Sequence, residues 1–258
     1  MIELRTQKDL RTVQNLAFCC ICGEPFRQRG ERTRHHLPPK AIFAEVDRNP
    51  PLILPAHGAC NRDQSPLDTV IAQLVAVRHG KYPARKNLKL EVATVPLRGG
   101  QLKAGVTNLP LRPIIFRWVR CFHAALYREY LIDRGGMIFE PFQTADVVAG
   151  QLVFSKIPMD RPFLTDLFKQ QARAGRTDTV VCYNEKCVYR CSWLKTDDGR
   201  PFCLFALRLY DWERLGDPDC PRMGCLGWYW ASAPPNCATG VHLELAVANL
   251  VPLDPFAS

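Results

Sequence analysis

Two short ligand pairs constrain this chain more than any other feature of its sequence. Cys19-x-x-Cys22 and His57-x-x-Cys60 each place two metal-ligating side chains on either side of a two-residue spacer. Such a spacer lets both side chains of a tight turn reach one tetrahedral ion, so two pairs make one closed four-ligand site. The sequence therefore predicts a structural zinc ion (Zn²⁺) held by Cys19, Cys22, His57 and Cys60. Cys20 is interpreted as a spacer that could also substitute for Cys19.

The remaining cysteines do not repeat this spacing. The chain has 258 residues and 12 cysteines, and seven of these lie from Cys182 onward. The first residues contain no apolar signal core, and in a chain without a secretory signal cysteines favour thiols or metal ligands over disulfides. No apolar run approaches the roughly 18 residues of a membrane helix. We therefore expect a cytoplasmic protein with no membrane contact, whose late cysteines pack in a sheet core, with a second zinc site as the alternative.

Positive charge gathers in the first part of the chain. Residues 1–100 contain 16 of the 34 basic side chains and 9 of the 25 acidic ones, so they carry +7 of the formal net charge of +9. Arg27, Arg29, Arg32 and Arg34 alternate, and alternate residues of an extended segment share a face. A row of guanidinium groups on one face can follow phosphates, which predicts a nucleic-acid partner for this part of the chain.

Hydrophobic periodicity predicts an α+β fold. Apolar residues at helical spacing predict helices over 9–18, 61–80, 114–133 and 164–172. Short strands are expected at 32–37 and around 52–54, one strand at 90–95, and later strands at 137–142, 152–154, 179–193, 202–210, 226–230 and 241–246. These elements suggest a zinc-containing module over 1–80 and a basic linker over 81–113. An α+β accessory domain with a mostly antiparallel sheet over 114–258 would supply substrate or partner contacts.

The residues between and after the ligand pairs form a recognisable order. Arg34-His35-His36-Leu37-Pro38 lies between the pairs, and Asn61 directly follows the second pair. This order resembles the HNH endonucleases (ββα-metal or His-Me finger nucleases) in their zinc-knuckle form, over roughly residues 16–80. Pro38-Pro39-Lys40 also looks like the Pro-Lys segment that follows the histidine in some members. The resemblance implies an N-terminal ββα-metal nuclease module.

The resemblance also implies a reaction and the residues that perform it. His36 would be the general base, and His35 and Asn61 would hold one divalent ion, Mg²⁺ or Mn²⁺, during hydrolysis of DNA phosphodiester bonds. RNA is not excluded as a substrate. Lys40 and the four arginines would contact the nucleic acid. Some HNH proteins serve in prokaryotic defence or in mobile elements, which suggests an effector that acts with an activating or guide-bearing protein partner.

One position departs from the family pattern, and alternatives follow from it. Many members carry an orienting Asn about nine residues before the position of Asn61, where this chain has Leu52. Either the backbone of this segment holds His36, or Asn49 reaches it from the loop, or the site is weakened. A permutation in which His35 or His36 replaces His57 at the zinc would free His57 for the catalytic ion. A catalytically inactive, zinc-stabilised nucleic-acid-binding or scaffold protein is the other hypothesis.

Overall fold

The three-dimensional structure is a computed structural model of the whole chain. It describes the following residues: 1–78, 91–96, 102–107, 111–131, 145–148, 151–154, 162–196, 199–210, 224–230, 235 and 244–245. The strand expected at 137–142 lies outside them.

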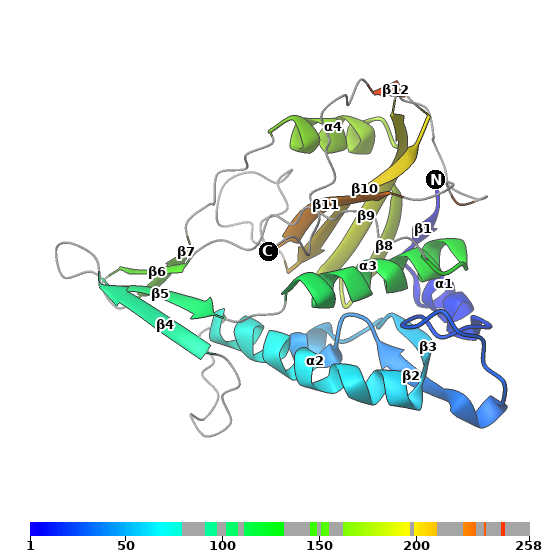
Figure 1. Ribbon diagram of the computed structural model, residues 1–258, viewed down its shortest axis with the longest axis horizontal. Coiled ribbons are helices and arrows are strands. Elements are labelled where there is room, and N and C mark those ends of the chain that lie inside the picture. Colours follow the sequence, from blue (N-terminus) through cyan, green and yellow to red (C-terminus); the bar gives the residue numbers. More distant parts are fainter. Residues whose placement is uncertain are drawn as a thin grey trace.

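A six-stranded sheet forms the centre of the molecule (Figure 1). Its order is β1-β8-β9-β10-β11, and β12 pairs with one end of β9. Within the sheet, β8–β9, β9–β10 and β10–β11 are antiparallel pairs, whereas β1–β8 and β12–β9 are parallel. The strands span Glu3–Leu4 (β1), Asp178–Cys182 (β8), Cys187–Thr196 (β9), Pro201–Leu209 (β10), Gly224–Trp230 (β11) and Glu244–Leu245 (β12). The expected α+β class with a mostly antiparallel sheet is confirmed.

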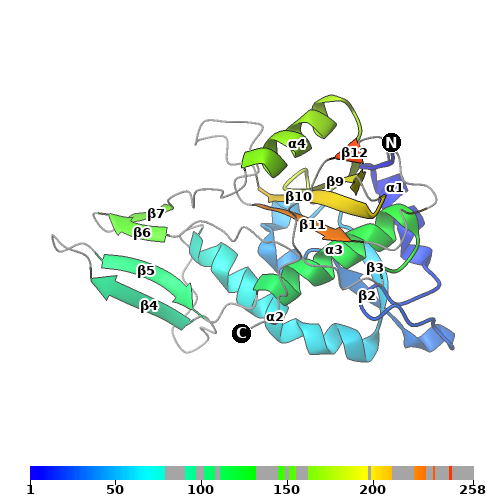
Figure 2. The ribbon, with the colours of Figure 1, turned by 45° about the horizontal axis from the view of Figure 1, so that its top comes forward.

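Two helices cover opposite faces of this sheet. Helix α3 (Leu111–Tyr127) lies between the sheet and the N-terminal elements, and α4 (Pro162–Arg173) lies on the far face (Figures 1 and 2). Phe122 of α3 stacks on Tyr189 of β9 with ring centroids 4.6 Å apart. On its other side, α3 donates a hydrogen bond from Cys121 Sγ to the Cys20 carbonyl, 3.4 Å away. Because α3 is apolar on both sides, one hydrophobic core runs from the N-terminal residues into the sheet.

Two strands and a long helix follow one another in the first third of the chain. Strand β2 (Arg32–His36) pairs antiparallel with β3 (Ile53–His57), and α2 (Gly58–Arg78) begins directly after β3. Three short 3₁₀ helices flank or connect these strands: η2 (Arg29–Glu31), η3 (Lys40–Ile42) and η4 (Glu45–Asp47). This β–β–α order places His35 of β2 beside the first turn of α2, with His36 next to it in the strand.

The basic segment after α2 forms more structure than the sequence indicated. One strand was expected over 81–113, but β4 (Glu91–Pro96) and β5 (Leu102–Thr107) make an antiparallel hairpin there. Two later strands, β6 (Ala145–Val148) and β7 (Gln151–Phe154), extend it to a four-stranded sheet. This small sheet projects beyond the end of α2, away from the central sheet (Figure 2). The division of the chain at residues 80 and 113 stays a prediction.

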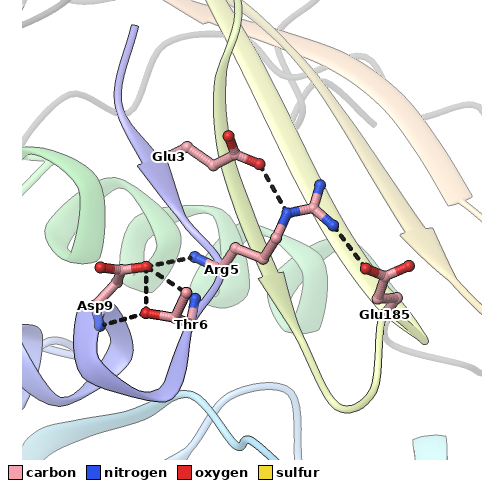
Figure 3. A network of polar contacts seen from close by, with 5 residues as sticks. All are labelled: Glu3, Arg5, Thr6, Asp9 and Glu185. Carbon is pink, nitrogen blue, oxygen red and sulfur yellow. Dashed lines mark hydrogen bonds and ion pairs between the residues drawn. The ribbon is translucent and has the colours of Figure 1, made fainter.

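The N-terminus is tied to the central sheet (Figure 3). Arg5 donates hydrogen bonds to Glu3 at 2.8 Å and to Glu185, in the β8–β9 turn, at 2.6 Å. Thr6 and Asp9 form a capping box that begins α1 (Gln7–Thr12), which continues into the 3₁₀ helix η1 (Val13–Asn15). Among the described residues, no helix combines the length and apolar character needed to cross a membrane.

Candidate metal centre and adjoining histidine pair

The structure brings the four predicted zinc ligands together. One ligand atom from each of Cys19, Cys22, His57 and Cys60 lies within 4.8 Å of all the others. Ligand sulfurs around a tetrahedral zinc ion with Zn–S bonds of about 2.3 Å are themselves about 3.8 Å apart, so little closure is needed to hold an ion. Three thiols and one imidazole are a donor set typical of structural zinc sites. The group could therefore hold a metal ion such as zinc.

A glycine shapes the turn that carries the first two ligands. Gly23 has φ of +81°, and its N–H donates to the Cys19 carbonyl at 2.8 Å. A Cβ atom here would lie 2.5 Å from the Tyr130 ring. Glycine is therefore required both by the backbone conformation and by the close approach of the ring. Cys20 is not one of the four clustered ligands, and its N–H donates to the Pro55 carbonyl at 3.1 Å.

A carboxylate that the sequence did not reveal lies near His57. Its Nδ1 lies 3.4 Å from Cys22 Sγ, while its Nε2 lies 3.8 Å from a carboxylate oxygen of Glu31. Phe26 packs edge-on against the imidazole, with ring centroids 4.8 Å apart. A ligating histidine commonly directs its second nitrogen to a carboxylate, which fixes the tautomer and the ring. This contact favours His57, rather than His35 or His36, as the fourth member of the centre.

The surroundings of the thiols explain why a cation would be needed to ionise them. Burial raises the pKa of Cys19, although hydrogen bonds from the backbone N–H groups of Cys22, His57 and Ile21 partly offset it. Burial and the neighbouring thiols raise the pKa of Cys60 to about 12. Thiolates clustered this closely repel one another unless a cation lies among them. Metal binding at this centre would therefore be coupled to the release of protons.

The two histidines of β2 face opposite sides of the strand. His35 is 1% exposed, and its Nδ1 lies 2.9 Å from Oδ1 of Asn61 in the first turn of α2. Asn61 also donates from Nδ2 to the Arg34 carbonyl at 3.3 Å. Since side chains alternate along a strand, His36 shares the opposite face with Arg32 and Arg34. The structure thus pairs His35 with Asn61 and places His36 on the other face of the strand, so an ion that served both expected roles would have to lie at the strand edge.

His36 is half-buried among positive charges. Burial, together with the charges of Lys40, His35 and Arg34, lowers the pKa of His36 to about 4. A neutral imidazole is the form that can accept a proton. The Nδ1 atom of His36 is buried and has no hydrogen-bond partner in the part of the chain that the structure describes. Asn49 is exposed and makes no hydrogen bond with His36 within that part, so it does not supply the orienting amide.

The predicted nucleic-acid contacts are mostly on the surface. Arg27, Arg32, Arg34 and Lys40 are exposed, whereas the side chain of Arg29 lies outside the described residues. The Arg32 guanidinium lies over the Phe26 ring, 4.9 Å from its centroid. Arg32 and Arg34 share the His36 face of β2, so they are placed beside the candidate base.

Two residues of α3 that the sequence did not single out adjoin His35. Burial lowers the pKa of His35, but contacts with the Cys121 thiol and with Asn61 outweigh this effect and raise it. Arg117, one helical turn before Cys121, donates to Gln64 at 2.9 Å and forms an ion pair with Asp68. Asp68, which follows Asn61 by two helical turns, is therefore paired with Arg117. In the sequence, only the four-residue spacing of Arg117 and Cys121 indicated that these two side chains share one face of a helix.

Comparisons with known proteins add no relative. No protein-family model, no curated protein and no solved structure matches this chain. A functional interpretation therefore depends on the residues of the site and their chemistry.

Proposed function

We propose that this chain is a metal-dependent endonuclease of the HNH kind that hydrolyses phosphodiester bonds of DNA. One observation carries the proposal. A β–β–α segment places His35 Nδ1 and Asn61 Oδ1 2.9 Å apart, with His36 next in the strand and a four-ligand metal centre at the base of the same helix. Each part alone is common, but their ordered combination is specific.

The His35–Asn61 pair suits a divalent ion. Adjacent ligands of an octahedral cation with bonds of about 2.1 Å lie about 3.0 Å apart, close to the observed separation of these two atoms. His35 and Asn61 would hold Mg²⁺ or Mn²⁺, with water and phosphate oxygens as the other ligands. When bound, the ion would stabilise negative charge on the phosphate and on the leaving oxygen. The Cys19–Cys22–His57–Cys60 centre, by contrast, has no free position and would have a structural role.

His36 would accept the proton of the attacking water. Its low pKa keeps the ring neutral at physiological pH, which makes the base form available although it is a weak base. The exposed guanidinium groups of Arg32 and Arg34 on the same face would hold the phosphate backbone beside the ring. Phosphate contacts carry no sequence information, so these arginines would support binding to many sequences.

A second function is favoured by the surroundings of His36. Its Nδ1 lacks a partner within the described residues, and Leu52 occupies the position of the orienting Asn. A zinc-stabilised protein that binds nucleic acid without cutting it would have the same basic face and metal centre. An effector that cuts only with an activating protein partner would behave in the same way when purified alone.

Cleavage of plasmid DNA separates these functions. Zinc-loaded protein should cut in Mg²⁺ or Mn²⁺, and His36→Ala should lower the rate about 10²- to 10⁴-fold, the usual contribution of a general base. Its zinc content and DNA affinity should be unchanged. Zinc-loaded, folded wild type that binds but never cuts single- or double-stranded DNA or RNA would instead support the binding function.

DNA affinity tests the basic face separately. Arg34→Gln should weaken binding and lower the salt dependence by about one counterion. Arg173→Gln is the matched control, because Arg173 is an exposed arginine of α4, on the far face of the central sheet (Figure 1). Equal effects of both substitutions would mean that affinity reflects net charge alone.

A further inference from the structure

The segment after β2 determines where the His36 ring points. No hydrogen bond from a described residue reaches His36 Nδ1, so the placement of the ring depends on the backbone that carries it and on the side chains packed around it. One side of this backbone is held by the residue before β3, because the Leu37 N–H donates to the Leu52 carbonyl at 3.0 Å. Leu52 thus contributes a main-chain acceptor at the position where the resembling nucleases carry an orienting side chain.

The other side of the segment is held from the central sheet. Tyr183, in the turn between β8 and β9, donates a hydrogen bond from its hydroxyl to the Pro38 carbonyl at 2.7 Å. Its own N–H donates to the Pro50 carbonyl at 2.8 Å. Its ring stacks on Phe43 with centroids 4.1 Å apart and planes 10° from parallel. One residue therefore binds the beginning, middle and end of the connection between β2 and β3.

Tyr183 is well suited to hold a fixed position. Its side chain is fully buried, at 0% exposure. Burial also raises its pKa, so the hydroxyl keeps the proton that it donates. The Pro38 carbonyl lies two residues after His36, and the Leu37–Leu52 bond lies one residue after it. The backbone next to the candidate base is therefore fixed between two elements that are far apart in sequence.

We propose that Tyr183 is a positioning residue for His36, which holds the backbone of the candidate base through the Pro38 carbonyl in place of an orienting side chain. The inference rests on the proposed nuclease function. Under this proposal, the contact between the central sheet and the N-terminal module supports catalysis by holding His36 in place. No hydrogen bond or ring contact joins Tyr183 to His36 within the part of the chain that the structure describes.

Tyr183→Phe removes the hydroxyl and keeps the stacked ring. We expect kcat to fall roughly 10- to 100-fold, because a small misplacement of a reacting group has an effect of this size. KM, DNA affinity and zinc content should be unchanged. Tyr189→Phe is the matched control: its hydroxyl is also buried in the sheet but has no hydrogen-bond partner among the described residues. Equal kcat values for the two variants, or a parallel loss of DNA affinity in Tyr183→Phe, would overturn the proposal.

Two further measurements cover the remaining outcomes. If Tyr183→Phe does not fold, Tyr210→Phe decides, because the Tyr210 hydroxyl donates to the Ile42 carbonyl in the same segment. A fall in kcat of a few-fold would support the proposal, and an unchanged kcat would overturn it. If the isolated wild type does not cut, kcat cannot be compared, but the NMR signals of the His36 ring still report its orientation. One sharp set in wild type and exchange-broadened signals in Tyr183→Phe support positioning; identical signals refute it.

Discussion

A buried ion pair joins the helix of the candidate site to α3. Asp68 of α2 and Arg117 of α3 have side chains that are only 19% and 6% exposed. Arg117 also donates to Gln64, one turn earlier in α2, at 2.9 Å. Burial raises the pKa of Asp68, even though the Arg117 charge acts to lower it. The Arg117 charge therefore does not fully offset the cost of burying the Asp68 carboxylate.

This balance predicts very different costs for single and double substitutions. Asp68→Leu leaves a buried guanidinium whose remaining hydrogen-bond partner among the described residues is Gln64. This should cost about 3 kcal/mol, near the lower end for a broken buried pair. Arg117→Met leaves a carboxylate that can protonate or reach water, at about 1–2 kcal/mol. The double variant removes both charges and should have about the stability of wild type. The expected coupling free energy is therefore about 4–5 kcal/mol.

Urea unfolding of the zinc-loaded protein at pH 7 measures all four members of this cycle. Tryptophan fluorescence is a suitable signal, since Trp118 is buried in α3 beside the pair. With a slope of about 2–3 kcal/mol per molar urea, Asp68→Leu should move the midpoint down by about 1–1.5 M. The double variant should return to the wild-type midpoint and keep its zinc. A double variant that loses the sum of the single costs would refute the reasoning.

Three other perturbations have defined outcomes. Cys60→Ala should abolish stoichiometric zinc in metal analysis, whereas Cys20→Ala, a buried thiol outside the metal centre, should retain it. Burial lowers the pKa of His123 to about 3, against about 6.5 in an unfolded chain, so its stabilising effect is complete above that higher value and declines as the pH falls toward 3. His123→Gln should therefore lose about 2 kcal/mol less stability than wild type between pH 7 and 5 in urea titrations, and equal losses would contradict this. Asp178 accepts hydrogen bonds from Ile2 N at 2.6 Å and from the Tyr127 hydroxyl at 2.9 Å, so Asp178→Asn should lower the unfolding free energy by about 2–4 kcal/mol, roughly twice the effect of Tyr127→Phe.

Local patterns in the sequence were sufficient to predict the elements of the site. The ligand pairs, the histidine dipeptide and Asn61 lie within a few residues of a turn, a strand end or a helix start. Helix α2 begins at Gly58, three residues before the expected start at residue 61. Period and spacing are short-range properties, and the chain satisfies them without help from distant segments.

Long-range pairings could not be predicted in the same way. Strand β1 has only two residues, and its pairing with β8 joins Glu3 to Thr179. Strand β5 contains Gly105 and Lys103 and lacks a clear alternation of apolar and polar residues. The sequence therefore did not predict its hairpin with β4. In the sequence, nothing distinguishes Glu31 from other charged residues, and only the fold places it near His57. Such contacts depend on tertiary packing, which residue spacing does not encode.

The candidate site is supported by α3 and by the β8–β9 turn, and this has a consequence for the N-terminal module. Leu37 and Leu54 are completely buried, at 0% exposure, in a core that also contains Trp118 of α3 and Tyr183 of the β8–β9 turn. A fragment ending at residue 80 would lose α3 and this turn. It would expose apolar side chains and leave the Pro38 carbonyl without its donor. The metal centre is local and could survive in such a fragment, but the geometry around His36 could not. We therefore expect a 1–80 fragment to retain zinc ligands without a defined active site.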